Sequence, residues 1–204
     1  MLRTHTCNEL NTDHIGQAVK LAGWVDTIRD HGGVIFVDLR DHYGITQVVL
    51  SDESLMNGVG KETVILVEGR VSKRDAETVN PKLETGMIEV RVERVEILGP
   101  SLPNLPFDIS ASTQTREDVR LKYRFLDLRN DKIHSNIVLR AKVISFLRKQ
   151  MEALGFMEIQ TPILTASSPE GARDYLVPAR NHPGKFYALP QAPQQFKQLL
   201  MTSG

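Results

Sequence analysis

Three polar side chains in the last quarter of the chain have types suited to holding a small charged ligand. Glu170 lies in the stretch 165–173, TASSPEGAR, whose small and turn-forming residues predict a movable loop that could act as a lid. Gln194 and Lys197 are three positions apart, a spacing that places both on one side of a helix. Each residue alone is more simply a surface group. The pattern indicates neither a catalytic nucleophile nor a set of metal ligands.

A second candidate site surrounds Phe36 in the stretch 34–40, VIFVDLR. Alternation with period two turns the aliphatic residues to one face: Ile35, Val37 and Leu39. Phe36 is then left on the other face, beside Asp38 and Arg40. Such a ring either packs under a loop of its own domain or stacks on an unpaired nucleobase whose edges are read by polar neighbours. The residues alone leave both interpretations open.

Five stretches between residues 19 and 99 alternate with the period of a β-strand: 19–30, 34–40, 45–51, 63–74 and 87–98. Turn residues separate the first three stretches, and 53–59 is expected to form a short helix. Five strands with a helical insert after the third predict an OB-fold barrel, in which the second and third strands commonly form the nucleic-acid face. Periodicity alone would also allow another small barrel.

The stretch 99–106, GPSLPNLP, should be extended and fairly stiff because it holds three prolines. We therefore place the barrel domain at 1–106, a hinge at 107–134 and a second domain from 135 to 204. The densest positive run of the chain falls in the hinge: Arg116, Arg120, Lys122, Arg124 and Arg129. A solvated face is favoured over a direct RNA contact for this run.

From Ser135 to Leu154 the apolar residues recur every three or four positions, which predicts a helix with Ser135 as its N-cap. A second apolar set makes this helix apolar on more than one side: Leu139, Val143 and Phe146. The helix is therefore expected to meet a partner beyond its own sheet. An extended strand is expected at 156–159, before Pro162.

The composition is that of a soluble globular protein, with 41% hydrophobic and 25% charged residues. Lysine plus arginine equals aspartate plus glutamate at 25 each, so any RNA must be bound by local patches and not by bulk positive charge. Cys7 is the only cysteine, which fits a reducing compartment. No stretch has the apolar length of a signal peptide core or a membrane helix. We therefore expect a cytoplasmic protein without a membrane partner.

Four stretches resemble the bacterial-type aspartyl-tRNA synthetases, which are class II aminoacyl-tRNA synthetases. GFMEIQTPIL at 155–164 resembles class II motif 1, with its proline at Pro162. SSPEGARDYLVPAR at 167–180 resembles the loop that closes over bound aspartate, and LPQAPQQFKQLLM at 189–201 resembles the aspartate-pocket segment. RLKYRFLDLR at 120–129 resembles the hinge of the family. Lysyl and asparaginyl enzymes have different residues in the second and third stretches.

The resemblance implies an aspartate–tRNA ligase that binds L-aspartate, ATP with Mg²⁺ and tRNA, and that forms a homodimer through motif 1. Lys197 would meet the side-chain carboxylate of aspartate, which the neutral amide of asparagine cannot replace. Glu170 would cover the ammonium group, and Gln194 would hydrogen-bond the ammonium or the α-carboxylate. Many members have a serine where this chain has Ala192, so one hydroxyl contact to the substrate would be missing.

In the barrel, the resemblance implies that four residues bind the anticodon: Arg29, Phe36, Gln47 and, as the weakest candidate, Glu93. Two residues of the barrel loops are candidates for distinguishing tRNA for aspartate from tRNA for asparagine: His31 and Lys82. Which of the two tRNAs is charged stays open at this point.

The implied fold is β plus α/β: a five-stranded OB-fold barrel, a hinge, and the beginning of the antiparallel-sheet catalytic domain of class II synthetases. The ATP-binding motifs 2 and 3 of the family would lie beyond Gly204, so we expect the 204-residue chain alone to be inactive. Two alternatives remain. One is a non-catalytic RNA-binding fragment or paralogue that uses the barrel alone, and the other is an asparaginyl or lysyl enzyme.

Overall fold

The computed structural model describes residues 2–167, 174–189 and 192–204, and the chain divides into two compact units, Met1–Asp108 and Ile109–Gly204. The finer division into a barrel at 1–106, a hinge at 107–134 and a second domain at 135–204 stays a prediction. Each unit has its own secondary structure, and the two candidate sites fall in different units.

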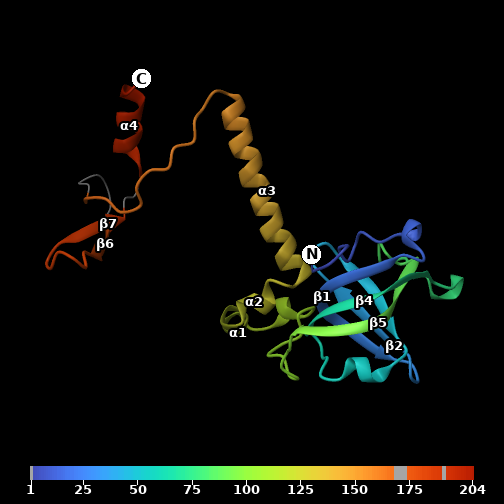
Figure 1. Ribbon diagram of the computed structural model, residues 1–204. Coiled ribbons are helices and arrows are strands. Elements are labelled where there is room, and N and C mark those ends of the chain that lie inside the picture. Colours follow the sequence, from blue (N-terminus) through green and yellow to red (C-terminus); the bar gives the residue numbers. More distant parts are fainter. Residues whose placement is uncertain (1, 168–173, 190–191) are drawn as a thin grey trace. The chain divides into compact units, whose positions relative to one another are not determined.

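Five strands form a closed barrel in the first unit (Figure 1): β1 (Ala18–Asp30), β2 (Ile35–Arg40), β3 (Ile45–Leu50), β4 (Val64–Lys73) and β5 (Ile88–Gly99). Neighbouring strands follow the order β1-β2-β3-β5-β4 around the barrel. The β3–β5 pair is parallel and the other pairs are antiparallel. The structure thus confirms the OB-fold, and the predicted strand ends are correct to within one residue.

The barrel interior is filled by the aliphatic side chains of alternating positions. In β2 the alternation is complete, because Ile35, Val37 and Leu39 are buried while the residues between them are half-buried. The other strands supply the rest of the core, including Leu21, Val25, Val48, Leu50, Ile65, Val67, Val71, Ile88 and Val90. Phe36 therefore points away from the core, as predicted.

A β-bulge between β4 and β5 bends the barrel wall. Glu68 pairs with Arg94 and Gly69 pairs with Val92, so Glu93 is the extra residue of β5. The backbones come so close here that a Cβ on Gly69 would lie 2.2 Å from the carbonyl oxygen of Arg91. Only glycine allows this approach, and the bulge is thereby fixed in register.

Three short 3₁₀ helices occur in the described part of the first unit: η1 (Thr12–His14) before β1, η2 (Glu53–Met56) between β3 and β4, and η3 (Ala76–Thr78) between β4 and β5. η2 replaces the predicted helix at 53–59, and its first turn is capped by the side chain of Asp52. The connection before β4 contains Glu62, a buried residue with a φ of 65°. Its carboxylate forms an ion pair with Arg40, whose guanidinium also binds Asp26 at 3.0 Å.

The second unit begins with η4 (Ser112–Gln114), α1 (Glu117–Lys122) and α2 (Arg124–Asp127), followed by the long helix α3 (Asp131–Ala153). The predicted N-cap Ser135 is wrong, because α3 starts one turn earlier. Asn130 caps it, accepting hydrogen bonds at its Oδ1 from the backbone N–H groups of Lys132 and Ile133. The amide of the same side chain donates to the carbonyl of Ile109, which fixes the cap.

Beyond α3 the second unit contains the antiparallel pair β6 (Tyr175–Pro178) and β7 (Phe186–Leu189) and the helix α4 (Gln194–Thr202). The predicted strand at 156–159 is wrong, since these residues pair with no other strand of the described chain. An extended backbone counts as a strand only when a neighbour satisfies its N–H and C=O groups. None of the helices within the described ranges is long and apolar enough to cross a membrane.

Candidate nucleic-acid interface

A hollow of about 310 Å³ lies on the outer face of the barrel around Phe36. Its lining comes from β2, β3, the end of β4, the connection after β4, and β5, and includes Phe36, Gln47, Lys73, Thr78, Glu89 and Arg91. The volume lies at the lower end of the range of about 300–1,000 Å³ that is typical of small-ligand sites. A hollow of this size with one aromatic ring and several polar groups suits a planar, hydrogen-bonding ligand such as a nucleobase.

Phe36 is held by its neighbours on both adjacent strands. In the strand register it lies opposite Arg29 of β1 and Val49 of β3. The imidazole ring of His31 meets the Phe36 ring edge-on, with 5.5 Å between the ring centroids and 80° between the ring planes. The side chain is half-buried and lines the hollow, so part of it is left for a ligand.

Two charged residues next to Phe36 neutralise each other. Arg29 donates two hydrogen bonds to the carboxylate of Asp38, Nη1 to Oδ2 at 2.9 Å and Nη2 to Oδ1 at 2.8 Å. This bidentate geometry fixes the guanidinium plane beside the hollow. Gln47 lies opposite Asp38 on β3, is 8% exposed and lines the same hollow. The structure thus brings Arg29, Phe36 and Gln47 together, while their roles toward RNA stay predictions.

Glu89 and Arg91 line the hollow from β5, and sequence reasoning missed both. Their guanidinium and carboxylate are 3.8 Å apart, and the Glu89 side chain is 13% exposed. The alternation around Ile88 and Val90 could have shown that Glu89 and Arg91 face outward. Their place beside Phe36 could not be read in this way, because it depends on the parallel pairing of β5 with β3.

Glu93 and Lys82 do not line this hollow. Glu93 is the bulged residue of β5 and forms an ion pair with Arg70 at 3.4 Å, with 66% of its side chain exposed. Lys82 is exposed in the loop before β5, where its backbone N–H donates to the side-chain oxygen of Asn80. Of the four predicted anticodon residues, Phe36 and Gln47 line the hollow, Arg29 lies beside Phe36 on the neighbouring strand, and Glu93 lies outside it.

The candidate aspartate-binding residues belong to the second unit. Gln194 and Lys197 both lie on α4 and are exposed, one turn apart as predicted. Glu170 lies outside the described residues, and Ala192 is exposed just before α4. Pro162, the predicted motif 1 proline, is exposed in the segment that follows α3. The grouping of Glu170, Gln194 and Lys197 around a substrate stays a prediction.

The basic run of the predicted hinge is largely neutralised within the second unit. Arg120 donates to both oxygens of Asp127, at 2.9 and 3.3 Å, and Arg124 donates to Oδ2 of the same carboxylate. Burial alone would raise the pKa of Asp127, but the hydrogen bonds from Arg120, the Ser112 hydroxyl and the charges of Arg120 and Arg124 together outweigh it and hold that pKa below its usual value. Arg116 is paired with Asp118. At least three of the five basic residues of this run thus form ion pairs within the second unit, while the preference for a solvated face over RNA contact stays a prediction.

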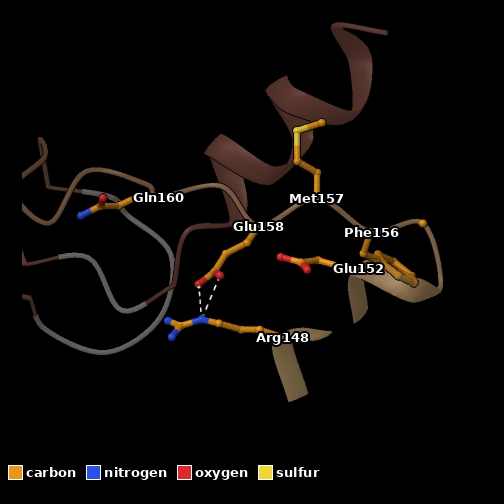
Figure 2. A pocket seen from close by; sticks show the side chains of 7 residues that line it. Arg148, Glu152, Phe156, Met157, Glu158 and Gln160 are labelled. Atoms are coloured by element: carbon orange, nitrogen blue, oxygen red, sulfur yellow. Dashed lines mark hydrogen bonds and ion pairs between the residues drawn. The ribbon is translucent and has the colours of Figure 1, made fainter. Parts of the chain in front are cut away.

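A second hollow, at the C-terminal end of α3, is shown in Figure 2 and is lined by residues of α3 and of the segment that follows it. Arg148 of α3 and Glu158 face each other across it, with Nε 2.9 Å from Oε1 and 2.8 Å from Oε2. Both side chains are more than half exposed, so the ion pair adds little stability. It does tie the segment after α3 back to the helix.

The outer surface of α3 carries large apolar side chains that the described residues leave exposed, among them Leu139, Val143, Phe146, Leu147 and Met151. That the helix meets a partner through these side chains stays a prediction. Clusters of three or more His, Cys, Asp or Glu side chains suited to a metal ion do not occur in the described part of the chain.

Two family models match the chain. Residues 19–98 match the OB-fold nucleic-acid-binding domain of the tRNA anticodon type, and residues 116–204 match the class II tRNA synthetases (D, K and N). The "Aspartate--tRNA(Asp/Asn) ligase" of Cereibacter sphaeroides is 58% identical over 99% of this chain, and that of Anaplasma phagocytophilum is 59% identical over all of it. The chain spans 35% of the length of these curated relatives.

Two solved structures of tRNA synthetases are similar to the chain. The asparaginyl-tRNA synthetase of Pyrococcus horikoshii, in complex with asparaginyl-adenylate, matches with a TM-score of 0.82 and 25% identity, over 99% of this chain and 46% of that one. A putative aspartyl-tRNA synthetase from Leishmania major Friedlin matches with a TM-score of 0.83 and 22% identity, over 98% of this chain and 41% of that one. The second likeness shows the fold alone.

Proposed function

The chain belongs to the class II aspartyl-tRNA synthetases, and from this premise we propose that it supplies the anticodon-reading part of an aspartate–tRNA ligase. The observation that carries the proposal is the outward ring of Phe36 in a hollow lined by Gln47 and by charged side chains. Base stacking on an aromatic ring contributes about 1–3 kcal/mol per base. Polar groups around the ring supply the discrimination among bases that stacking lacks.

We assign roles in this hollow from position and chemistry. Phe36 would stack on one unpaired anticodon base. Gln47 carries both a donor and an acceptor and would read the edge of that base. Arg29, oriented by Asp38, would keep its guanidinium plane ready for a second base or a phosphate. Glu93 stays a weaker candidate, because its ion pair with Arg70 lies outside the hollow.

The whole protein would activate L-aspartate and transfer it to tRNA. In the first step an α-carboxylate oxygen of aspartate attacks the α-phosphorus of ATP, forming aspartyl-adenylate and releasing pyrophosphate. In the second step a hydroxyl of the terminal ribose of tRNA attacks the activated carbonyl and releases AMP. ATP would enter as its magnesium complex, and no step is assigned to a metal held by the described residues. Glu170, Gln194 and Lys197 would hold the aspartate.

The relatives are named for both tRNA for aspartate and tRNA for asparagine, and we propose the same double specificity for this chain. His31 is the better placed of the two predicted specificity residues, because its ring touches Phe36. By the genetic code the two anticodons, GUC and GUU, differ only in the third base. Anticodon stem-loops with these two sequences should therefore bind the chain with similar Kd values.

The assembly and the location of the protein are further proposals. The exposed apolar side chains of α3 and the motif 1 segment around Pro162 suit a homodimer, which light scattering of the full-length protein would test. A tRNA ligase works where protein synthesis takes place, so we propose a cytoplasmic location.

Two measurements test the central proposal. The chain should bind a GUC stem-loop more tightly than a stem-loop with a scrambled anticodon, and the full-length protein should exchange labelled pyrophosphate into ATP only with aspartate present. Equal affinity for both stem-loops would refute anticodon reading by this hollow. Exchange driven by asparagine or lysine, and not by aspartate, would place the enzyme in one of the sister groups.

A further inference from the structure

One wall of the Phe36 hollow is formed by the connection that follows β4. Asp75 and Thr78 line the hollow from this connection, next to Lys73 at the end of β4, and the short helix η3 (Ala76–Thr78) lies within the connection. All three lining residues are exposed, so the wall has no apolar anchor of its own. A segment with so few buried side chains keeps its shape only if its backbone is tied to the barrel.

Arg74, the residue between β4 and the 75–78 wall, connects the backbone of the wall to the barrel. The residue is 5% exposed, although both its chain neighbours are exposed and line the hollow. Its Nε donates to the carbonyl of Ile88 at 2.8 Å, at the start of β5, and its Nη1 donates to the carbonyl of Thr78 at 3.3 Å. One rigid guanidinium thus joins the end of the wall to the barrel.

The cost of burying this charge indicates that it serves more than stability. Nη2 is buried and finds no hydrogen-bond acceptor among the described residues. Burial lowers the pKa of Arg74, and the charges of Glu89 and Asp38 partly offset that effect while Arg29 adds to it. These are residues in or beside the hollow. A buried cation that is only partly satisfied is expensive, and an apolar residue could fill the same space more cheaply.

We propose that Arg74 is a positioning residue for anticodon recognition: by holding the carbonyl of Thr78 it fixes the 75–78 wall and thereby sets which bases the Phe36 hollow accepts. The inference rests on the proposed function. Base discrimination requires walls placed to within a fraction of an ångström, because a wrong base is rejected only where it clashes or leaves a polar group without a partner. A loose wall would keep the stacking on Phe36 but lose part of this rejection.

The test is Arg74→Lys in the 204-residue chain. Lysine keeps the positive charge, but its single ammonium group cannot reproduce the planar fork toward Ile88 and Thr78. The probes are a GUC stem-loop and three stem-loops in which one anticodon base is exchanged. For each exchanged stem-loop, discrimination is measured as its Kd divided by the Kd of the GUC stem-loop. For at least one anticodon position we expect this ratio to be about fivefold or more lower in Arg74→Lys than in the wild type, while the Kd for the GUC stem-loop changes by a smaller factor. Equal changes in all four Kd values, or none, would overturn the proposal.

Two further variants keep the experiment decisive if Arg74→Lys folds poorly. Ala76→Gly loosens the same wall from an exposed position that does not line the hollow, and it leaves the buried guanidinium intact, so it should fold and show the same loss of discrimination. Unchanged ratios in that variant would contradict the inference. Val71→Ala, in the barrel core, serves as a control that lowers stability without altering the wall, and its ratios should equal those of the wild type.

Phe36→Ala separates this inference from the proposed function. If neither the wild type nor Phe36→Ala prefers the GUC stem-loop, the proposed function fails and Arg74 has nothing to position. If Phe36→Ala loses binding while Arg74→Lys and Ala76→Gly keep the wild-type ratios, the proposed function stands and only the role of Arg74 is refuted.

Discussion

Replacing Phe36 by alanine tests the anticodon proposal most directly. If the ring stacks on one base, its removal should cost about 1–3 kcal/mol of binding free energy. At about 1.4 kcal/mol per tenfold change, the Kd for a GUC stem-loop should rise roughly 5- to 150-fold. The measurement is a titration of a labelled stem-loop at constant salt, because phosphate contacts make any Kd depend on ionic strength.

Phe36→Ala should lose little stability, so a change in its Kd can be attributed to the binding site. Full burial of a phenylalanine side chain is worth about 1.5–3 kcal/mol, and Phe36 is only half-buried, so we expect a loss of about 1 kcal/mol in the unfolding free energy. A domain with at least about 5 kcal/mol of stability would then remain more than about 99% folded at 25 °C. Weaker binding could not be attributed to unfolded protein.

Tyr43→Ala is the matched control. Tyr43 is an exposed aromatic residue in the turn between β2 and β3, outside the hollow, where it contacts Arg3. Its loss should leave the Kd within about twofold of the wild type. If Phe36→Ala lowers the Tm but leaves the Kd per folded molecule unchanged, Phe36 is only a packing residue and the stacking interpretation is refuted.

Three further results are expected. The fragment 1–108 should unfold cooperatively on its own, because it contains the closed barrel and its core; a featureless melt by circular dichroism would contradict this. Because the pKa of Asp127 is lowered, its contribution to stability is complete above the ordinary value of about 3.9 and is lost as the pH falls through the folded-state pKa. Asp127→Asn should therefore lower the unfolding free energy, measured by urea unfolding at pH 7, by about 2 kcal/mol. The unfolding free energy of the variant should also depend less on pH below about 4 than that of the wild type. If this pH dependence is unchanged, Asp127 is not its source. Arg40→Met should lower the unfolding free energy by about 3 kcal/mol, because buried Glu62 loses its guanidinium partner. A loss below about 1 kcal/mol in the same urea assay would show that this ion pair is not needed for stability.

The barrel could be predicted in detail because local rules decide it. In β2 the alternation of apolar and polar residues places Ile35, Val37 and Leu39 inside and Phe36 outside, and the strand follows that pattern. Segments whose structure depends on distant partners were predicted less well. Residues 156–159 have strand-forming side chains but no pairing strand among the described residues, and Asn130 outcompetes Ser135 as the N-cap because it also binds the carbonyl of Ile109.

The same distinction applies to the candidate site in the barrel. Arg29, Phe36 and Gln47 come from three consecutive antiparallel strands. The strand pairing places Arg29 opposite Phe36 and places Gln47 opposite Asp38, two residues further along β2, so the three side chains come together. Glu89 was missed because β5 joins the hollow through its parallel pairing with β3, which no sequence pattern announces. Glu93 does not line the hollow: it is the bulged residue of β5, beyond Arg91, where the pairing of β5 with β3 ends.

The two candidate sites also differ in how firmly their residues are held. Around Phe36 the side chains stand on paired strands over a filled core, so a substitution there has a local and calculable effect. Gln194 and Lys197 are fixed to each other only by one turn of α4, whose apolar residue Leu199 is 67% exposed in the described structure. Side chains that bind a substrate must be held by packed neighbours, and α4 shows few. Experiments on the barrel can therefore use this chain, whereas substitutions of Lys197 are informative only in the full-length protein with aspartate and ATP as probes.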